Sequence, residues 1–212
     1  DNIFFSSDHH FFHASNADIN RSIIHYCKRP FSSIEEMNEV LIDNWNRTVP
    51  PKADVFHLGD ILFVRSKKEE GEVLLKRLNG NIHLIEGNHD KKNIRKLAKH
   101  FIWVKDYHKL KIQEADGSRQ IIVLFHYPIL SFEQCAYGSW MCHGHSHGNL
   151  KPWVDRYLPQ SRIIDISVDA VAEYLSKDGI KKKEDYRPLS YYEIKDILSS
   201  KTGQAVDHHS EL

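Results

Sequence analysis

Residues that could bind a metal or transfer a proton follow several apolar runs of this chain, and one such group is the tetrapeptide Gly87-Asn88-His89-Asp90, directly after the run 82–85. Its amide, imidazole and carboxylate could act as an oxygen ligand, a proton donor and an orienting group. Open α/β sheets bind their ligands just beyond the carboxyl ends of strands, so this is a favourable place for a site. The alternative is an ordinary turn, because Gly and Asn accept positive φ and Asp caps helices.

Similar residues follow four other apolar runs. Asp8 and His10 end the first predicted strand, and in an extended segment their side chains would project to the same side. A polar turn with a chance histidine is the alternative for that segment. The remaining positions are Asp60, His126, His145 and His147.

Carboxylate, amide oxygen and imidazole together suit divalent metals such as Mn²⁺, Fe or Zn²⁺, whereas a thiolate-rich set would indicate a structural zinc site. Seven candidate ligands are too many for one ion. They suit two ions about 3.5–4 Å apart that share a carboxylate, an arrangement used for in-line displacement at phosphorus. Ordinary polar loop ends are the alternative for the whole set.

The first half of the chain alternates predicted strands with predicted helices. A capping box at Ser33 opens a helix, the segment 54–58 is the second strand, and 67–78 is a helix with Val73, Leu74 and Leu78 inward. A weak helical pattern covers 18–28, and a further helix is predicted over 91–100. These units predict βαβ crossovers and a largely parallel sheet whose loops gather at one edge.

The second half has a different pattern. Strands are predicted over 101–104, 107–113, 120–125 and 162–168, with a hairpin turn at 115–118. We expect this half to be antiparallel, with an exposed loop over 173–187. A second capping box at Ser190 opens the last helix.

Length and composition bound the class of protein. A chain of 212 residues suits one domain, predicted over 1–200, and 201–212 is predicted to be a disordered polar tail. Lys+Arg and Asp+Glu both number 29, which disfavours a dedicated nucleic-acid or membrane-surface binder. Three irregularly spaced cysteines indicate a reduced, cytoplasmic protein, and no apolar run suits a membrane span. A removed leader stays open, since the sequence starts at Asp1.

Five motifs, in this order, resemble those of the calcineurin-like metallophosphoesterases. They are D-x-H at 8–10, G-D at 59–60, G-N-H-D at 87–90, the lone His126, and G-H-x-H at 144–147. The stretches 8–13, 29–31 and 126–128 look most like the small bacterial and phage members. The resemblance implies an α/β fold, namely a four-layer α/β/β/α sandwich of two mixed β-sheets flanked by helices, the metallo-dependent phosphatase fold.

The resemblance also implies a role for each matched residue. One ion would lie on Asp8, His10 and His147, a second on Asn88, His126 and His145, and Asp60 would bridge them. Mn²⁺ is the preferred metal, with Fe, Zn or Ni as alternatives. A metal-bound hydroxide would attack a phosphate mono- or diester in line, and His89 would protonate the leaving oxygen.

The sequence departs from the larger phosphatases of that family after Gly59-Asp60. Where those carry a further Asp and an Arg, this chain has Phe63 and Val64. We predict that Asp90 replaces the missing Asp as the catalytic support of His89. The candidates for gripping the substrate phosphate are His13, Arg29 and Arg65. A protein-phosphatase activity is therefore disfavoured.

The predicted substrate is a small phosphorylated molecule or a nucleotide. A nuclease or nucleic-acid end-processing phosphodiesterase is the alternative, which the balanced charge disfavours. A non-catalytic scaffold of the same fold is a third hypothesis, disfavoured because no predicted ligand is missing. His9 and His57 are predicted to be structural, and no membrane partner is expected. The oligomeric state is left open.

Overall fold

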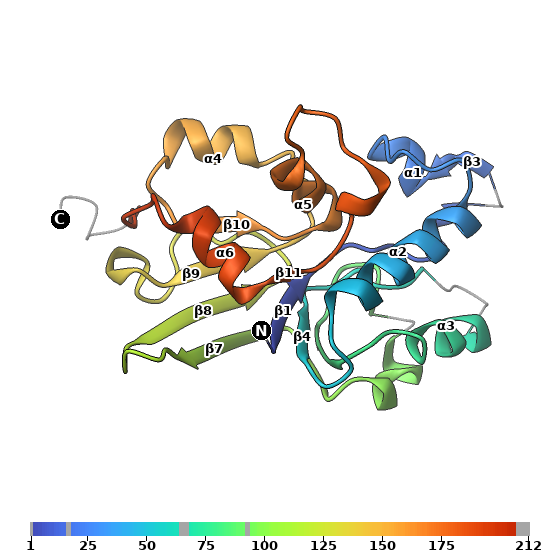
Figure 1. The fold of residues 1–212 in the computed structure, drawn as a ribbon, viewed down its shortest axis with the longest axis horizontal. Coiled ribbons are helices and arrows are strands. Elements are labelled where there is room, and N and C mark those ends of the chain that lie inside the picture. Colours follow the sequence, from blue (N-terminus) through green and yellow to red (C-terminus); the bar gives the residue numbers. More distant parts are fainter. Residues whose placement is uncertain (1, 16–17, 64–67, 92–93, 207–212) are drawn as a thin grey trace.

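The computed structural model describes residues 2–15, 18–63, 68–91 and 94–206, which form an α/β fold with two mixed sheets flanked by helices (Figure 1). The first sheet has the strand order β11-β1-β4-β5-β6, the second has the order β10-β9-β8-β7, and β2 and β3 pair separately. The strands are β1 (Ile3–Ser6), β2 (Ala14–Ser15), β3 (Asp18–Ser22), β4 (Asp54–His57), β5 (Asn81–Ile85), β6 (Trp103–Lys105), β7 (Tyr107–Gln113), β8 (Arg119–Phe125), β9 (Trp140–His143), β10 (Ile163–Asp165) and β11 (Leu189–Ser190). The α-helices are α1 (Ile23–Tyr26), α2 (Ile34–Thr48), α3 (Lys68–Leu75), α4 (Lys151–Tyr157), α5 (Val168–Leu175) and α6 (Tyr191–Leu198).

The first sheet follows the predicted βαβ pattern. β1, β4, β5 and β6 are parallel neighbours, so their carboxyl ends lie at one edge. The short strand β11, which the sequence did not indicate, pairs antiparallel with β1. Ser33 caps α2, since its hydroxyl accepts a hydrogen bond from the amide of Glu36 at 3.1 Å.

The second sheet differs from the antiparallel arrangement predicted for this half. β7 and β8 form the predicted antiparallel hairpin, but β8 pairs parallel with β9, and β9 pairs parallel with β10. Parallel neighbours need long connections, and the sequence between β9 and β10 supplies one in α4. The parallel pairing places the carboxyl ends of β8 and β9 side by side.

Five local predictions also differ from the structure. The segment 18–28 contains β3 and α1 rather than one helix, and 91–100 contains the 3₁₀ turns η1 (Ile94–Lys96) and η2 (Ala98–His100). The predicted strand 162–168 stops at Asp165, and α5 occupies part of the predicted loop. Residues 201–206, predicted as part of a disordered tail, pack on the fold: Gly203 N donates to Gln160 O, and Ala205 is buried. The rest of that tail, 207–212, lies outside the described residues.

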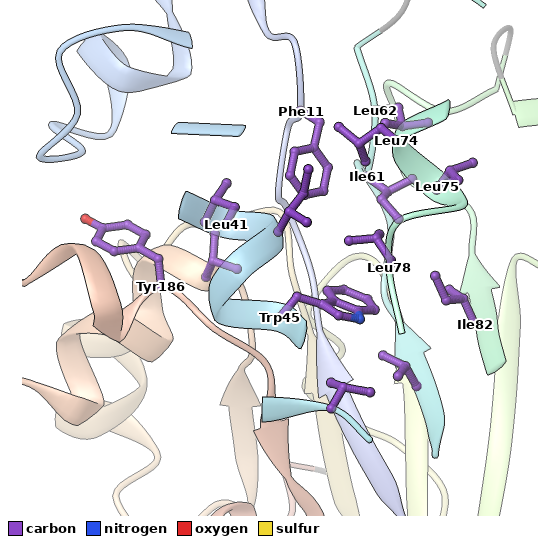
Figure 2. Packing of buried hydrophobic residues seen from close by; sticks show 14 of the residues in the cluster. Phe11, Leu41, Trp45, Ile61, Leu62, Leu74, Leu75, Leu78, Ile82 and Tyr186 are labelled. Carbon is purple, nitrogen blue, oxygen red and sulfur yellow. The ribbon is translucent and has the colours of Figure 1, made fainter. Parts of the chain in front are cut away.

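The core divides according to the alternation of side chains along the strands of the first sheet. Phe4, Val55 and Leu84 pack with α2 and α3 in the cluster seen in Figure 2, where Trp45 lies at the centre. Phe5, Phe56 and Ile85 point to the other face and pack against β8 and β9. Val73 of α3 is 60% exposed, so its predicted inward position is wrong. No helix in the described part of the chain is long and apolar enough to cross a membrane.

Candidate metal centre

The predicted ligands lie in loops at the carboxyl ends of five strands. The loops after β1, β4 and β5 belong to the first sheet, and those after β8 and β9 belong to the second. The residues that meet there are Asp8, His10, Asp60, Asn88, His126, His145 and His147. Both sheets therefore contribute side chains to one centre.

The backbone at this centre is unusual because five of those residues have left-handed backbone conformations. The φ angles are 57° at Asp8, 53° at His10, 54° at Asp60, 66° at His145 and 49° at His147. Positive φ is uncommon outside Gly, costs free energy, and clusters at functional sites. The extended geometry considered for the D-x-H segment is therefore wrong, and tight turns bring the side chains together instead.

A first group of ligand atoms surrounds the Asp8 carboxylate. Asp8 Oδ1 lies 3.6 Å from His10 Nε2 and 3.6 Å from His147 Nε2. His10 Nε2 also lies 3.8 Å from Asp60 Oδ2. Two atoms that bind one ion at about 2.1 Å, with bond angles near 90–120°, lie roughly 3.0–3.6 Å apart. The spacing of this group therefore suits a common cation.

A second group surrounds the Asn88 amide. Asn88 Oδ1 lies 2.9 Å from both His126 Nε2 and His145 Nδ1, and His126 Nε2 lies 3.6 Å from Asp60 Oδ2. The His126 Nδ1–H donates to Leu58 O at 2.7 Å, so in the neutral ring Nε2 presents a lone pair to Asn88 and Asp60. A lone pair directed at carboxylate and amide oxygens suits a cation between them.

Unpartnered polar atoms mark the same place. Asp8 Oδ1 and His10 Nε2 are buried and have no hydrogen-bond partner. Buried polar groups are nearly always paired, so orphaned acceptors that converge require an explanation. The donor set of carboxylate, amide and imidazole fits a first-row divalent metal. The described residues thus include acidic and histidine groups that could hold a metal.

The charge states of Asp8 and His10 suit cation binding, but that of His147 does not. Burial alone would raise the pKa of Asp8, but the His10 and His147 imidazoles beside it hold the pKa of that carboxyl below its usual range. Burial lowers the pKa of His10 to about 4, so its ring is neutral at pH 7. Metal ligation needs an ionised carboxylate and a neutral imidazole. Burial would lower the pKa of His147, yet its hydrogen bond to the Asp169 carboxylate raises that pKa to about 11, so this ring would release a proton on ligation.

His89 lies over the shared carboxylate without belonging to either group. Its amide donates to Asp60 Oδ1 at 2.8 Å, its Nε2 lies 3.9 Å from Asp60 Oδ2, and its side chain is 41% exposed. Phe63 packs edge-on against the imidazole, with ring centres 5.5 Å apart. The imidazole is thus positioned at the open face of the centre, where a bound molecule could reach it.

Asp90 contacts the backbone amides of two neighbouring loops. Its carboxylate is buried, and Oδ2 accepts hydrogen bonds from Asp60 N at 2.7 Å and from Gly87 N at 2.9 Å. Burial, followed by the charge of Asp60, raises the pKa of Asp90 to about 7. Asp90 therefore joins two loops through their backbone amides, and its catalytic assignment stays a prediction.

The three residues predicted to bind the substrate phosphate differ in their position relative to the centre. Arg29 is buried in an ion pair with Asp169, so its side chain cannot reach a substrate. His13 is half-buried at the centre, 5.2 Å from the His10 ring and 4.3 Å from the Phe63 ring, so it stays a candidate. Arg65 lies outside the described residues.

His9 and His57 lie beneath the centre, and their position agrees with the predicted structural role. Both are buried, and His9 Nδ1 and His57 Nε2 are 2.9 Å apart. His9 also packs against the rings of Phe11 and Trp45. Burial lowers the pKa of His57 to about 3, so this ring is neutral.

Two carboxylates that serve the centre were not predicted. Asp169 Oδ2 accepts the Nδ1–H of His147 at 2.7 Å, and Asp165 Oδ2 accepts from Ser146 Oγ at 2.6 Å and Gly148 N at 2.8 Å. Both carboxylates stand within a mostly apolar stretch of the sequence. A carboxylate buried there needs polar partners, so this position could have indicated their role.

A third group of close ligand atoms consists of Cys27, His147 and Asp169. It is poorly suited to a metal, because the Asp169 carboxylate already pairs with the Arg29 guanidinium at 2.7 Å. A cation at this position would be repelled by that guanidinium and would compete with the His147 Nδ1–H.

Two glycines leave space for the ligand carboxylates. A Cβ atom on Gly144 would lie 2.2 Å from Asp8 Oδ2, and one on Gly87 would lie 2.2 Å from Asp60 Oδ1. Both separations are far below van der Waals contact, so a methyl group would displace the carboxylate.

We therefore expect Gly144→Ala to weaken metal binding by at least about 10-fold, the lower limit for disturbing the support of a ligand. Isothermal titration with Mn²⁺ measures the effect. Gly117→Ala is the control. A Cβ there meets nothing within 4 Å, and the backbone strain from its φ of 88° is confined to the β7–β8 turn, at the opposite end of β8 from His126. Equal Mn²⁺ affinities of the two variants would contradict the prediction.

The chain also has relatives among known proteins, although no family model matches it. It is 36% identical over 169 residues to the uncharacterized protein MJ1445 of Methanocaldococcus jannaschii, a match that covers 80% of this chain and 82% of that protein. The chain therefore belongs to the same family as MJ1445. Its fold is similar to the crystal structure of the protein of unknown function AQ665 from Aquifex aeolicus, with a TM-score of 0.62, 24% identity, and coverage of 92% of this chain and 98% of that chain.

Proposed function

We propose that this protein is a dinuclear metal-dependent phosphoesterase of the calcineurin-like type, and that its sheets and helices form the four-layer α/β/β/α sandwich of those enzymes. The observation that carries the proposal is the position of Asp60. Its Oδ2 atom lies 3.8 Å from a histidine of the first ligand group and 3.6 Å from a histidine of the second, as a bridging carboxylate would. The ordered motifs of the sequence support the same reading.

In this proposal the two ligand groups hold two divalent ions, with Mn²⁺ preferred and Fe, Zn or Ni as alternatives. The first ion would be held by Asp8, His10 and His147, the second by Asn88, His126 and His145, and both by Asp60. When bound, such ions lower the pKa of a coordinated water and stabilise the charge that develops on phosphoryl oxygens.

The chain's own proton donor would be His89. Its ring faces Asp60 Oδ2 and is partly exposed, so a leaving oxygen of a substrate over the centre could accept a proton from Nε2. The rings of Phe63 and His10 pack edge-on against the His89 ring, with ring centres 5.5 and 5.4 Å away. In this proposal these packed rings would help to orient His89.

The substrate would be a phosphate mono- or diester of a small molecule or a nucleotide. A nucleic-acid phosphodiesterase is the second candidate, favoured by aromatic rings at the mouth of the centre. Tyr127 is 37% exposed and lies 4.7 Å from the His145 ring, and Tyr26 is 61% exposed and lies 6.3 Å from the His13 ring. Such rings can stack on bases. The cytoplasm stays the predicted location, which the three free cysteines suit.

The test is reconstitution followed by a substrate panel. Protein stripped with chelator is expected to take up two Mn²⁺ per chain and then to hydrolyse phosphate esters only in the presence of the metal. The panel contains mono-, di- and cyclic phosphate esters together with single-stranded DNA and RNA oligonucleotides, so it separates the two candidates. A wild-type protein that retains no divalent ion after reconstitution would overturn the proposal and would favour a non-catalytic scaffold.

A further inference from the structure

A buried ion pair lies behind the candidate centre. The guanidinium of Arg29, which follows α1, makes two hydrogen bonds to the carboxylate of Asp169 in the first turn of α5: Nε to Oδ1 at 2.9 Å and an Nη to Oδ2 at 2.7 Å. The side chains are 0% and 1% exposed. Burying two charges is expensive and adds little stability compared with apolar packing, so the pair calls for a role other than stability.

Both partners also contact the first ligand group. Asp169 Oδ2 accepts the Nδ1–H of His147 at 2.7 Å. The guanidinium donates to Asp8 O at 2.7 Å and to His9 O at 2.8 Å, which holds the turn that carries Asp8 and His10. One ion pair thus supports all three side chains that are particular to the first group.

The second group has a different support. The His126 Nδ1–H donates to the neutral carbonyl of Leu58 at 2.7 Å. A carboxylate partner makes an imidazole a stronger metal ligand than a carbonyl partner does, because it stabilises the positive charge that the ring acquires on ligation. The two groups therefore differ in the strength of their support, although their ligand types are similar.

We propose that Arg29 and Asp169 are positioning residues that make the first group, with Asp8, His10 and His147, the tighter of the two metal sites. Asp169 sets the tautomer of His147 and strengthens its Nε2 as a ligand, and Arg29 holds Asp169 and the Asp8 turn in place. The inference rests on the proposed dinuclear function. It also replaces the predicted role of Arg29 in gripping phosphate.

The experiment is a titration of metal-free protein with Mn²⁺, followed by calorimetry and by electron paramagnetic resonance. The wild type is expected to bind one Mn²⁺ tightly and a second more weakly, with a spin-coupled signal as the second site fills. Asp169→Asn keeps an oxygen acceptor for His147 but removes the charge. It is expected to weaken the tight site about 10- to 100-fold and to change the weak site by less than about 3-fold.

Two further variants separate this role from a general effect on folding. Asp169→Asn leaves Arg29 buried without its counter-ion, so the double variant Arg29→Met/Asp169→Asn, which removes both charges, is titrated as well and is expected to lose affinity at the same site. Asp165→Asn is the matched control. Asp165 is also buried and bonds the same loop, but through Ser146 and Gly148 rather than through a ligand ring. It is expected to change both sites equally.

The possible outcomes are distinct. Asp169→Asn protein that is folded by circular dichroism and binds both Mn²⁺ ions with wild-type affinity would overturn the inference and leave the proposed function intact. Equal weakening of both sites by Asp169→Asn would also overturn it, since that is the behaviour of a structural carboxylate. A wild-type protein that binds no Mn²⁺ would overturn the proposed function and this inference with it.

Discussion

Asp60→Asn protein is expected to lose high-affinity binding of both metal ions. The substitution keeps the shape of the side chain and an oxygen that can accept from His89 N, but it removes the negative charge shared by the two ligand groups. We expect the Mn²⁺ affinity to fall by at least about 100-fold, the upper end of the loss seen when the partner of a ligand is removed. Metal-dependent hydrolysis should fall with it, and calorimetric titration measures the loss directly.

The control for this variant is an aspartate at the opposite end of β4. Asp54 begins β4, whereas Asp60 follows its end, and the Asp54 carboxylate is 48% exposed. Asp54→Asn therefore removes the same charge far from the centre and should leave the Mn²⁺ affinity unchanged. Wild-type stoichiometry and affinity in Asp60→Asn protein would show that Asp60 does not bridge two ions.

His89→Ala protein should show the opposite pattern, with both metal ions bound and turnover largely lost. His89 is not needed by either ligand group, but its Nε2 faces the open side of the centre, 3.9 Å from Asp60 Oδ2. General acid catalysis contributes about 10²- to 10⁴-fold, so kcat should fall by that factor while the Mn²⁺ affinity stays within about 3-fold of the wild type.

The choice of substrate supplies an internal control for this variant. An ester with a p-nitrophenolate leaving group needs little protonation, whereas an alkyl ester needs a full proton transfer. His89→Ala should therefore be much less impaired on the aryl ester than on the alkyl ester. An equal loss on both esters would mean that His89 positions the substrate and does not donate the proton.

The elements of the fold that local patterns determine could be predicted from the sequence. Apolar runs indicated β1, β4 and β5, and capping residues at Ser33 and Ser190 marked the starts of α2 and α6. The parallel pairing of β8 with β9 could not be predicted, because strand order depends on how the intervening segments pack. α5 was missed because its first residues continue the apolar run of β10, and periodicity does not separate a short buried helix from a strand.

Local sequence patterns likewise predicted the candidate ligands but not the residues that support them. Residues such as Asp60 and His126 stand directly after strands, so sequence position alone placed them at one edge. Arg29 and Asp169 are 140 residues apart, and nothing local pairs them. The contacts of Asp90 could not be predicted either, because the sequence shows its neighbour His89 but not the backbone amides of Gly87 and Asp60 that its carboxylate contacts.

The candidate ligands come from two sheets, so the apolar layer between the sheets affects the geometry of the centre. Phe5 and Ile85 of one sheet pack in the same cluster as Leu124 and Cys142 of the other, and Leu124 precedes His126 by two residues. This hydrocarbon layer acts as a spacer, because its thickness sets how far the Asn88 loop stands from the His126 loop. Protein interiors are packed too densely to absorb a change in volume without movement. A methylene added or removed there would thus alter the separation of the two halves of the candidate metal centre without contacting either of them.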